Sequence, residues 1–323
     1  MFAHALTSRV LAYADQQSIG HEPFCTDIPG LLVARHFRPT DLTPVLYRPI
    51  FCLVLQGAKQ SSLGDEMVTF SQGQSVIVGL DLPTCASVVD ASRQRPYVAL
   101  ALQIDITLIK ELAAEIDDFG GADARASDGK GRVSAIAAGE ADEAIVNAME
   151  RLFGLLNKPA AAAILRPLLM REIHFWLLSA SHGALLRQLV QANSHAARIS
   201  EAIIHIRRTY VEPLRIPELA RAVGMSESAF HQHFKAICGT TPLQFQKRLR
   251  LIEAARLMKS ENQSVSAAAV AVGYESPTQF SREFSRMFGL SPREHRSSIS
   301  IAHGTSARPA APAHMRGQAD LSV

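Results

Sequence analysis

Two segments of this chain repeat one another, and the repeat limits the possible folds more than any other feature. AVGMSESAFHQHFKAICG occupies residues 222–239, and AVGYESPTQFSREFSRMFG occupies residues 271–289. With one residue inserted before the serine, eight positions are identical: Ala222/Ala271, Val223/Val272, Gly224/Gly273, Ser226/Ser276, Phe230/Phe280, Phe234/Phe284, Gly239/Gly289 and Pro242/Pro292. A spacing of this size is typical of one supersecondary unit that the chain uses twice.

Each copy carries the same local signals. An alanine-rich stretch, IPELARAV or VSAAAVAV, predicts a helix that stops at a glycine. Ser226 and Ser276 then predict the N-cap of a second helix, and Pro277 with Gln279 gives the second copy a capping-box pattern. Apolar residues at i, i+4 and i+7 of the second helices predict one buried stripe in each: Phe230, Phe234, Ile237 and Phe280, Phe284, Met287.

The opposite face of each second helix is polar and is expected to point outward. It carries Ser228, His231, Gln232 and Lys235 in the first copy, and Thr278, Ser281, Arg282 and Ser285 in the second. Helix, glycine turn and capped helix with such a face is the pattern of a helix-turn-helix unit, whose second helix enters the DNA major groove. A helical hairpin used only for packing is the alternative, and two copies on a basic segment favour DNA binding.

The charge of the chain is unevenly distributed. Residues 196–296 hold 15 Lys and Arg against 9 Asp and Glu, whereas residues 1–195 carry a net charge of −4 within a total of +3. A basic back half joined to an acidic front half indicates that the back half meets a polyanion.

A helical segment, PLQFQKRLRLIEAARLMKS, separates the two copies and carries Lys247, Arg248 and Arg250. About 17 helical residues at ~1.5 Å each span roughly 25 Å. Successive major-groove segments lie about 34 Å apart on one face of the duplex. We therefore expect one monomer to place two helices in consecutive grooves.

The rest of the chain predicts an α+β protein of two domains. Short aliphatic runs between turn residues predict strands in a β-barrel or sandwich over residues 20–105. Helical patterns follow over 106–192, with a Gly- and Asp-rich mobile loop at 119–132 and long helices at 134–157 and 160–192. We expect a first domain over 1–192, a DNA-binding domain over 193–296 and a disordered tail over 297–323.

Composition excludes several classes of protein. The four cysteines, Cys25, Cys52, Cys85 and Cys238, form no C-x-x-C pair, so reduced thiols are expected. The N-terminus lacks the pattern of a secretory signal, and charged residues interrupt the most apolar stretch. We expect a soluble, cytoplasmic protein without a membrane segment, cofactor or metal.

Residues 196–296 resemble the DNA-binding domain of the AraC/XylS family of bacterial transcriptional regulators. SESAFHQHFKAICGTTPLQFQKRLRLIEAARLM and VGYESPTQFSREFSRMFGLSPREHR carry the resemblance. It implies two helix-turn-helix units on one face of promoter DNA, with RNA polymerase as a partner and activation of transcription. By position, it implies base contacts by Ser228, His231, Gln232, Thr278, Ser281 and Arg282, and phosphate contacts by Lys235, Ser276 and Arg286.

The front half resembles the N-terminal domain of one AraC-type subgroup. RPTDLTPVLYRPIFCLVLQGAKQSSLGD and REIHFWLLSASHGALLRQL carry this likeness. It implies a cupin-like β-barrel that binds a small-molecule effector of unknown identity, together with helices that form a homodimer.

The residues of the front half leave its chemistry open. PIFCLVLQGAKQSSLGDEMVTF has no histidine, which argues against the metal site of a cupin enzyme. A polar effector pocket is one hypothesis, and surface charge over an ordinary core is the alternative; the candidate pocket residues are Arg35, His36, Arg38, Tyr47, Arg48 and Cys52. A purely structural front domain, a Cys52 redox sensor and a DNA-targeted enzyme with an active cysteine are the competing functions.

Overall fold

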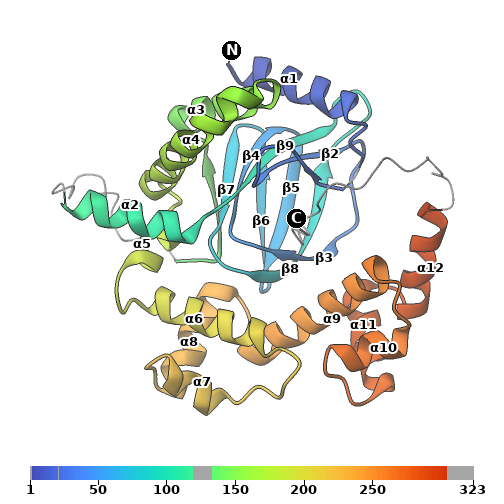
Figure 1. Ribbon diagram of the computed structural model, residues 1–323. Helices are drawn as coiled ribbons and strands as arrows, with labels where there is room; N and C mark the ends of the chain where they lie inside the picture. The colour runs from blue at the N-terminus through green and yellow to red at the C-terminus, as the bar shows by residue number, and fades with distance from the viewer. Residues whose placement is uncertain (1, 21, 119–132, 304–323) are drawn as a thin grey trace.

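The computed structural model describes residues 2–20, 22–118 and 133–303 of the chain, so the loop predicted at 119–132 lies outside the described residues. It consists of a β-rich front domain and a helical domain that carries the repeat (Figure 1). The helical domain lies below the sheets in this view, and helices α1 (Phe2–Gln16), α3 (Glu143–Gly154) and α4 (Pro159–Ser179) lie above them.

The front domain contains two antiparallel sheets. The first has the strand order β1-β2-β9-β4-β7-β10, and the second has the order β3-β8-β5-β6. Their bounds are β1 Phe24–Cys25, β2 Leu31–His36, β3 Thr43–Tyr47, β4 Ile50–Gln56, β5 Ala58–Leu63, β6 Glu66–Ser71, β7 Gln74–Val78, β8 Leu82–Asp90, β9 Tyr97–Gln103 and β10 Ile136–Glu140. Short strands rich in Val, Leu and Ile that alternate between two faces fit this arrangement.

A closed β-barrel was predicted here, and this prediction is wrong in one respect. The backbone ladders of the described residues form two separate sheets and do not join into a ring. The outer strands limit pairing: β1 has two residues, and β3 contains Pro44, which has no N–H to donate to a further strand. The front domain is therefore a two-sheet sandwich.

The strand β10 was also unforeseen, because residues 134–157 were expected to form one long helix. Instead Ile136–Glu140 pairs antiparallel with β7, from Ile136 opposite Val78 to Glu140 opposite Gln74. Helix α3 starts only at Glu143, where the Asp142 carboxylate accepts a hydrogen bond from Ala144 N at 2.8 Å. Pairing with an open sheet edge has outweighed the helical preference of the Ala residues.

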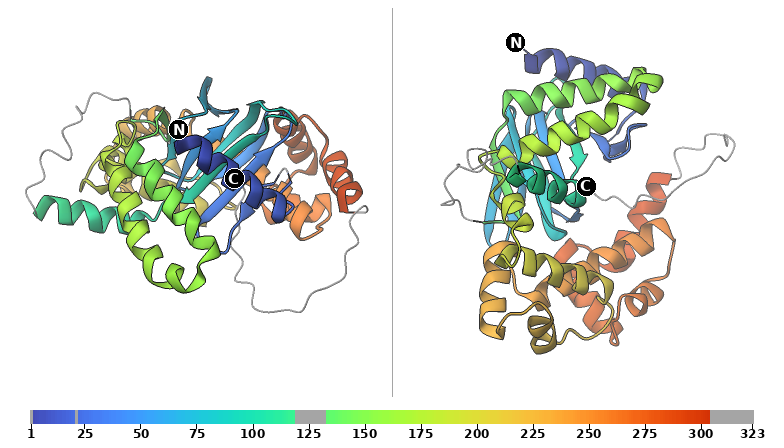
Figure 2. Two further views of the ribbon diagram at one scale, coloured as in Figure 1. Left: turned by 90° about the horizontal axis from the view of Figure 1, so that it is seen from above. Right: turned by 60° about the vertical axis from the view of Figure 1, so that its left-hand side comes forward.

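Helices cover the outer surfaces of the sandwich. Helix α1 packs on the first sheet through Leu6, Val10 and Ala14 (Figure 2). Helix α2 (Ile106–Asp118), the 3₁₀ turn η2 (Leu155–Asn157), α4 and α5 (Ala184–Val190) complete the front domain. The helix expected over 160–192 is broken at Gly183, where a Cβ would lie 2.3 Å from the Leu177 carbonyl oxygen.

The back domain is helical, as expected. It comprises α6 (His195–Arg208), α7 (Ile216–Ala222), α8 (Glu227–Cys238), α9 (Pro242–Ser260), α10 (Val265–Ala271), α11 (Pro277–Phe288) and α12 (Pro292–His303). A disordered tail was expected from residue 297, but α12 continues to His303, and residues 304–323 lie outside the described part of the chain.

The apolar core links the two domains. One cluster of buried side chains extends from the sandwich through α6 to Phe230, Phe234 and Phe245, whereas Phe280 and Phe284 belong to a second cluster with α9 and α10. Ala135 N also donates a hydrogen bond to Ile237 O at 2.9 Å. The first repeat unit is therefore packed into the same core as the front domain.

Candidate nucleic-acid interface

The two repeats form two helix pairs with the same internal packing. In the first, α7 precedes α8, and in the second, α10 precedes α11. The ring centroids of Phe230 and Phe234 lie 5.6 Å apart, and those of Phe280 and Phe284 lie 5.5 Å apart, with all four rings fully buried. The predicted apolar stripes thus hold each second helix against its domain.

The starts of α8 and α11 are fixed by the two serines that the sequence indicated as N-caps. Ser226 Oγ accepts a hydrogen bond from Ala229 N at 3.3 Å, and Ser276 Oγ accepts one from Gln279 N at 3.3 Å. Gly239 and Gly289 end the two helices with left-handed φ values of 68° and 72°. Gln279 departs from the capping-box prediction, because its side-chain amide donates to Glu283 Oε1 at 3.1 Å.

The polar faces of α8 and α11 point to solvent. Five of the six side chains expected to contact bases are exposed, and Ser281 is half-buried: Ser228, His231, Gln232, Thr278, Ser281 and Arg282. Of the side chains expected to contact phosphate, Lys235 and Arg286 are exposed, whereas Ser276 is half-buried and caps α11. These faces are free of the protein core and present hydrogen-bonding groups that can reach base edges.

The residue directly before the second phenylalanine of each repeat connects its helix to a neighbouring segment. In α11 it is Glu283, which accepts hydrogen bonds from Lys247 Nζ at 2.9 Å and from the Tyr274 hydroxyl at 2.7 Å. Burial raises the pKa of Glu283, but the bonds from Tyr274 and Lys247 outweigh it, so the net pKa is lowered. In α8 the equivalent residue is His233, whose ring stacks on His195 of α6 with centroids 3.7 Å apart.

The basic residues of the linker helix α9 face protein as well as solvent. Lys247 pairs with Glu283, and Arg248 lies close enough to Cys85 of β8 to lower the pKa of that thiol, which burial raises overall. Arg250 donates to the carbonyl oxygens of Tyr210 at 2.6 Å, Glu212 at 2.9 Å and Gly273 at 3.0 Å. Lys247 and Arg250 therefore hold the linker against the second unit, and Arg250 also holds it against the loop that follows α6.

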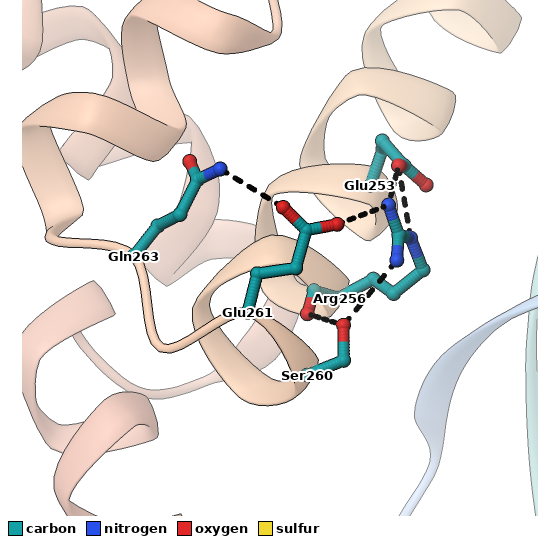
Figure 3. A network of polar contacts seen from close by, with 5 residues as sticks. All are labelled: Glu253, Arg256, Ser260, Glu261 and Gln263. Carbon is teal, nitrogen blue, oxygen red and sulfur yellow. Dashed lines mark hydrogen bonds and ion pairs between the residues drawn. The ribbon is translucent and has the colours of Figure 1, made fainter.

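A polar network closes the C-terminal end of α9 (Figure 3). Arg256 Nη2 lies 2.6 Å from Glu253 Oε1 and 3.2 Å from Glu261 Oε1, and its Nη1 donates to Ser260 Oγ at 3.3 Å. Gln263 donates to the other Glu261 oxygen at 3.1 Å. The network fixes the chain between α9 and α10, and with it the start of the second unit.

The six candidate effector residues do not share one location. Arg35 is buried on the outer face of the first sheet, where it donates to Ile19 O and pairs with Asp15 of α1. Arg38 is exposed, and His36 and Arg48 are half-buried. Tyr47 and Cys52 face the space between the sheets, and the Tyr47 hydroxyl lies 2.8 Å from Ser61 Oγ.

Three further residues, which the sequence pattern did not indicate, lie in this space between the sheets. Lys59 Nζ lies 5.4 Å from the centre of the Tyr47 ring, Ser61 is fully buried, and Tyr97 is buried beside Cys52. The alternation of β5, in which Lys59 and Ser61 share one face, is the signal that points to the first two.

Sequence profiles match both halves of the chain. That of the AraC-type transcriptional regulator N-terminus matches residues 27–185, and that of a helix-turn-helix domain matches residues 219–298. The chain belongs to the AraC family of transcriptional regulators. The family is one of regulators and not of enzymes. Burial raises the pKa of Cys52, Cys85 and Cys238, whereas a reactive cysteine needs a lowered pKa.

Several curated AraC-type regulators are similar to the back half. The chain is 32% identical over 117 residues to the HTH-type transcriptional regulator YisR of Bacillus subtilis. The aligned segment covers 36% of this chain and 41% of that protein. It is 37% identical over 91 residues to the MmsAB operon regulatory protein of Pseudomonas aeruginosa. This aligned segment covers 28% of this chain and 30% of that protein. The chain thus spans less than half the length of these relatives.

Among solved structures, the fold is similar to that of ToxT from Vibrio cholerae in a form bound to an unsaturated fatty acid. The TM-score is 0.56 at 12% identity, over 84% of this chain and 97% of ToxT. This likeness shows that the order of a β-rich front domain and a helical back domain is shared.

No described helix is long and apolar enough to span a bilayer. Within residues 2–20, 22–118 and 133–303, no three His, Cys, Asp or Glu side chains come together in a group able to hold a metal ion.

Proposed function

We propose that this protein is a sequence-specific DNA-binding transcription factor that binds double-stranded promoter DNA through α8 and α11. The observation that carries the proposal is the pair of capped helices whose polar faces are exposed while their phenylalanines are buried. A single linker helix of 19 residues joins them, which suits a contact with two successive major-groove segments.

In this proposal, six side chains contact bases and three contact phosphates. The base contacts are Ser228, His231 and Gln232 of α8, and Thr278, Ser281 and Arg282 of α11. The phosphate contacts are Lys235, Ser276 and Arg286. Arg282 is the strongest candidate for base discrimination, because a guanidinium binds guanine O6 and N7 through two parallel hydrogen bonds.

The front domain is proposed to bind a small-molecule effector, and RNA polymerase is proposed as a partner at the promoter. ToxT, which shares the fold, has been solved with an unsaturated fatty acid bound. Tyr47 and Cys52, from the expected effector set, lie between the two sheets, where a ligand is shielded from water.

A homodimer is proposed to form through α4. This helix exposes an apolar face in which Ile164 is 71%, Leu165 43% and Leu168 60% exposed. Arg9, Arg151 and Lys158 lie beside this face with Glu150 and Glu172. A surface with both signs of charge around an apolar centre complements a second copy of itself in a two-fold dimer. Leu168→Glu is expected to halve the mass in solution measured by light scattering, and an unchanged mass would remove α4 from the interface.

Footprinting and a salt titration test the proposal. Purified protein is expected to protect roughly 17–20 base pairs per monomer, about two groove segments. The logarithm of the binding constant is expected to fall linearly with the logarithm of salt concentration, because each phosphate contact releases condensed counterions. Protection of a single groove segment, or affinity that is independent of salt, would contradict the proposal.

A DNA-binding protein with a purely structural front domain is the second candidate. The continuous apolar core from the sandwich to the first repeat unit favours it, because this core joins the two parts without a separate interface. An effector that shifts DNA affinity would exclude this candidate.

A further inference from the structure

The space between the two sheets is lined by small side chains at its centre. Cross-strand pairing places Ala34 opposite Ala99, Cys52 opposite Ala101, and Ser61 opposite Ala86. Stacked sheets lie about 10 Å apart, so small side chains on both inner surfaces leave the gap between them incompletely filled.

The exposure of these residues agrees with such a gap. Cys52 lies in β4, with β9 on one side and β7 on the other, and it faces the second sheet. It is nevertheless only half-buried, whereas Phe51 and Leu53 on the opposite face are 0% and 2% exposed. Ala34 and Lys59, which face the same space, are also half-buried. A side chain at the centre of a covered sheet keeps exposure only where space for water lies above it.

A cationic side chain enters this space without a carboxylate partner among the described residues. The Lys59 ammonium group lies 5.4 Å from the centre of the Tyr47 ring, and the neighbouring groups that affect its charge are Tyr47 and Cys52. Burial lowers the pKa of Lys59, but these neighbours outweigh it and the net pKa is raised, so the group stays protonated. A half-buried cation without an anionic partner carries part of the desolvation cost of a charge taken from water, and a bound anion would offset it.

Hydroxyl groups and apolar side chains surround the ammonium group. The hydroxyls of Tyr47 and Ser61 lie 2.8 Å apart, and Tyr97 is 1% exposed beside Cys52. Phe70 and Val88 are the strand neighbours of Lys59 on the same inner surface. The space thus offers one positive charge, a few hydrogen-bonding groups and apolar walls.

We propose that the space between the sheets binds a monocarboxylic acid with a small apolar body, whose carboxylate pairs with Lys59 and accepts a hydrogen bond from the Tyr47–Ser61 hydroxyl pair. This inference rests on the proposed function, because it assigns a ligand class to the effector that the front domain is proposed to bind. One cation matches one negative charge; a dicarboxylate would bring a second charge that this site leaves unpaired.

The site has a direct structural route to the first DNA-reading helix. Lys59 and Ser61 lie in β5, and the turn after this strand begins at Gly64. A Cβ on Gly64 would lie 2.3 Å from the carbonyl oxygen of Gly239, the residue that ends α8. Because the backbones touch, a ligand that shifts β5 acts on the end of α8 without an intermediate element.

Calorimetric titration of the full-length protein with matched acids and amides tests the site. Hexanoate and benzoate are the probes, with hexanamide and benzamide as uncharged equivalents of the same shape. We expect the unmodified protein to bind one of the acids at least tenfold more tightly than its amide, and to bind adipate more weakly than hexanoate. Equal affinity for acid and amide, or no binding of either acid at millimolar concentration, would overturn the proposal.

Two variants and a control locate the charge. Lys59→Met keeps most of the side-chain length and is expected to reduce the preference for acid over amide to about one. Ser61→Ala, a milder change, is expected to weaken acid binding several-fold. Lys110→Met removes an exposed lysine of α2 and is expected to retain the full preference. A Lys59→Met protein that still prefers the acid would overturn the assignment.

DNA binding by the same preparations separates this inference from the function on which it rests. If the unmodified protein binds DNA but does not distinguish acid from amide, the ligand assignment alone fails. If it distinguishes acid from amide but binds no DNA, the proposed function fails and the ligand site stands.

Discussion

The backbone of Gly64, in the turn between β5 and β6, lies against the backbone of Gly239, which ends α8. A Cβ added to Gly239 would lie 2.5 Å from Gly64 N and 2.6 Å from the Leu63 carbonyl carbon. Both glycines have left-handed φ values, 66° and 68°. The equivalent helix α11 ends at Gly289 with φ 72°, but a Cβ there would meet nothing within 4 Å. Among the described residues, the front domain thus lies against the C-terminal cap of α8 and not against the equivalent cap of α11.

This difference gives a matched pair of substitutions. Gly289→Ala is expected to lower the free energy of unfolding by about 1–2 kcal/mol, the cost of a left-handed alanine. Gly239→Ala carries the same backbone cost and also forces the β5–β6 turn away from α8, so we expect a larger loss. Urea unfolding measures both, and equal losses for the two variants would show that the contact between the domains contributes nothing.

Arg282 and Lys235 separate base recognition from phosphate binding. Arg282→Ala is expected to relax base preference at one position of the binding site by about 1–3 kcal/mol. Lys235→Ala is expected to weaken binding to all sequences alike and to reduce the salt slope by about one. Competition against a set of single-base variants of one binding site measures both effects. A uniform loss in Arg282→Ala would assign that side chain to the backbone instead.

The repeat could be predicted from sequence because its signals are local. N-capping serines, turn glycines and phenylalanines at helical spacing act within about a dozen residues, and the structure has each of them in its expected role. The exposed faces of α8 and α11 follow from the same spacing. Gln279 is the exception, since it bonds Glu283 one turn further along α11, where Lys247 of α9 bonds the same carboxylate oxygen.

The front domain could not be predicted to the same depth, because its features depend on long-range pairing. The strand Ile136–Glu140 exists because β7 has an open edge, which no local signal shows. Arg35 and His36 were grouped as pocket residues because they are neighbours in sequence, but adjacent strand residues point to opposite faces of a sheet. The signal for Lys59 was missed because its surroundings become unusual only when the first sheet, with Cys52, packs against the second sheet, to which Lys59 belongs.

Arg250 is expected to contribute to stability and not to phosphate binding. Its guanidinium donates to three carbonyl oxygens on two segments, Tyr210 and Glu212 between α6 and α7 and Gly273 after α10. A lysine ammonium group does not reproduce these bonds in the same fixed geometry. Arg250→Lys is expected to lower the free energy of unfolding by about 1–3 kcal/mol while leaving the salt slope of DNA binding unchanged. Arg293→Lys, at an exposed position of α12, is the control and should leave stability unchanged. A reduced salt slope in Arg250→Lys would instead place Arg250 on the DNA.

His174 is expected to make stability depend on pH. It is fully buried in α4, where Nε2 accepts a hydrogen bond from Asp105 N at 2.9 Å, so the proton of the neutral ring is on Nδ1, 2.7 Å from Met170 O. Burial lowers the pKa of His174 below its usual value of 6.5. The neutral ring is therefore favoured in the folded state, and its contribution is complete above pH 6.5 and is lost as pH falls through the lowered pKa.

The measurement compares the unmodified protein with His174→Gln, which retains a side-chain acceptor but does not titrate. Between pH 6.5 and the lowered pKa, the free energy of unfolding of the unmodified protein should fall, relative to the variant, by up to about 1.4 kcal/mol per pH unit. The difference isolates His174 from other histidines, since these titrate in both proteins. Because Asp105 also caps α2 through its bond from Thr107 N, the loss should begin as local opening of the α2–α4 contact, detectable by amide exchange in α2. Parallel stability curves for the two proteins over this pH range would show that the ring is not held neutral.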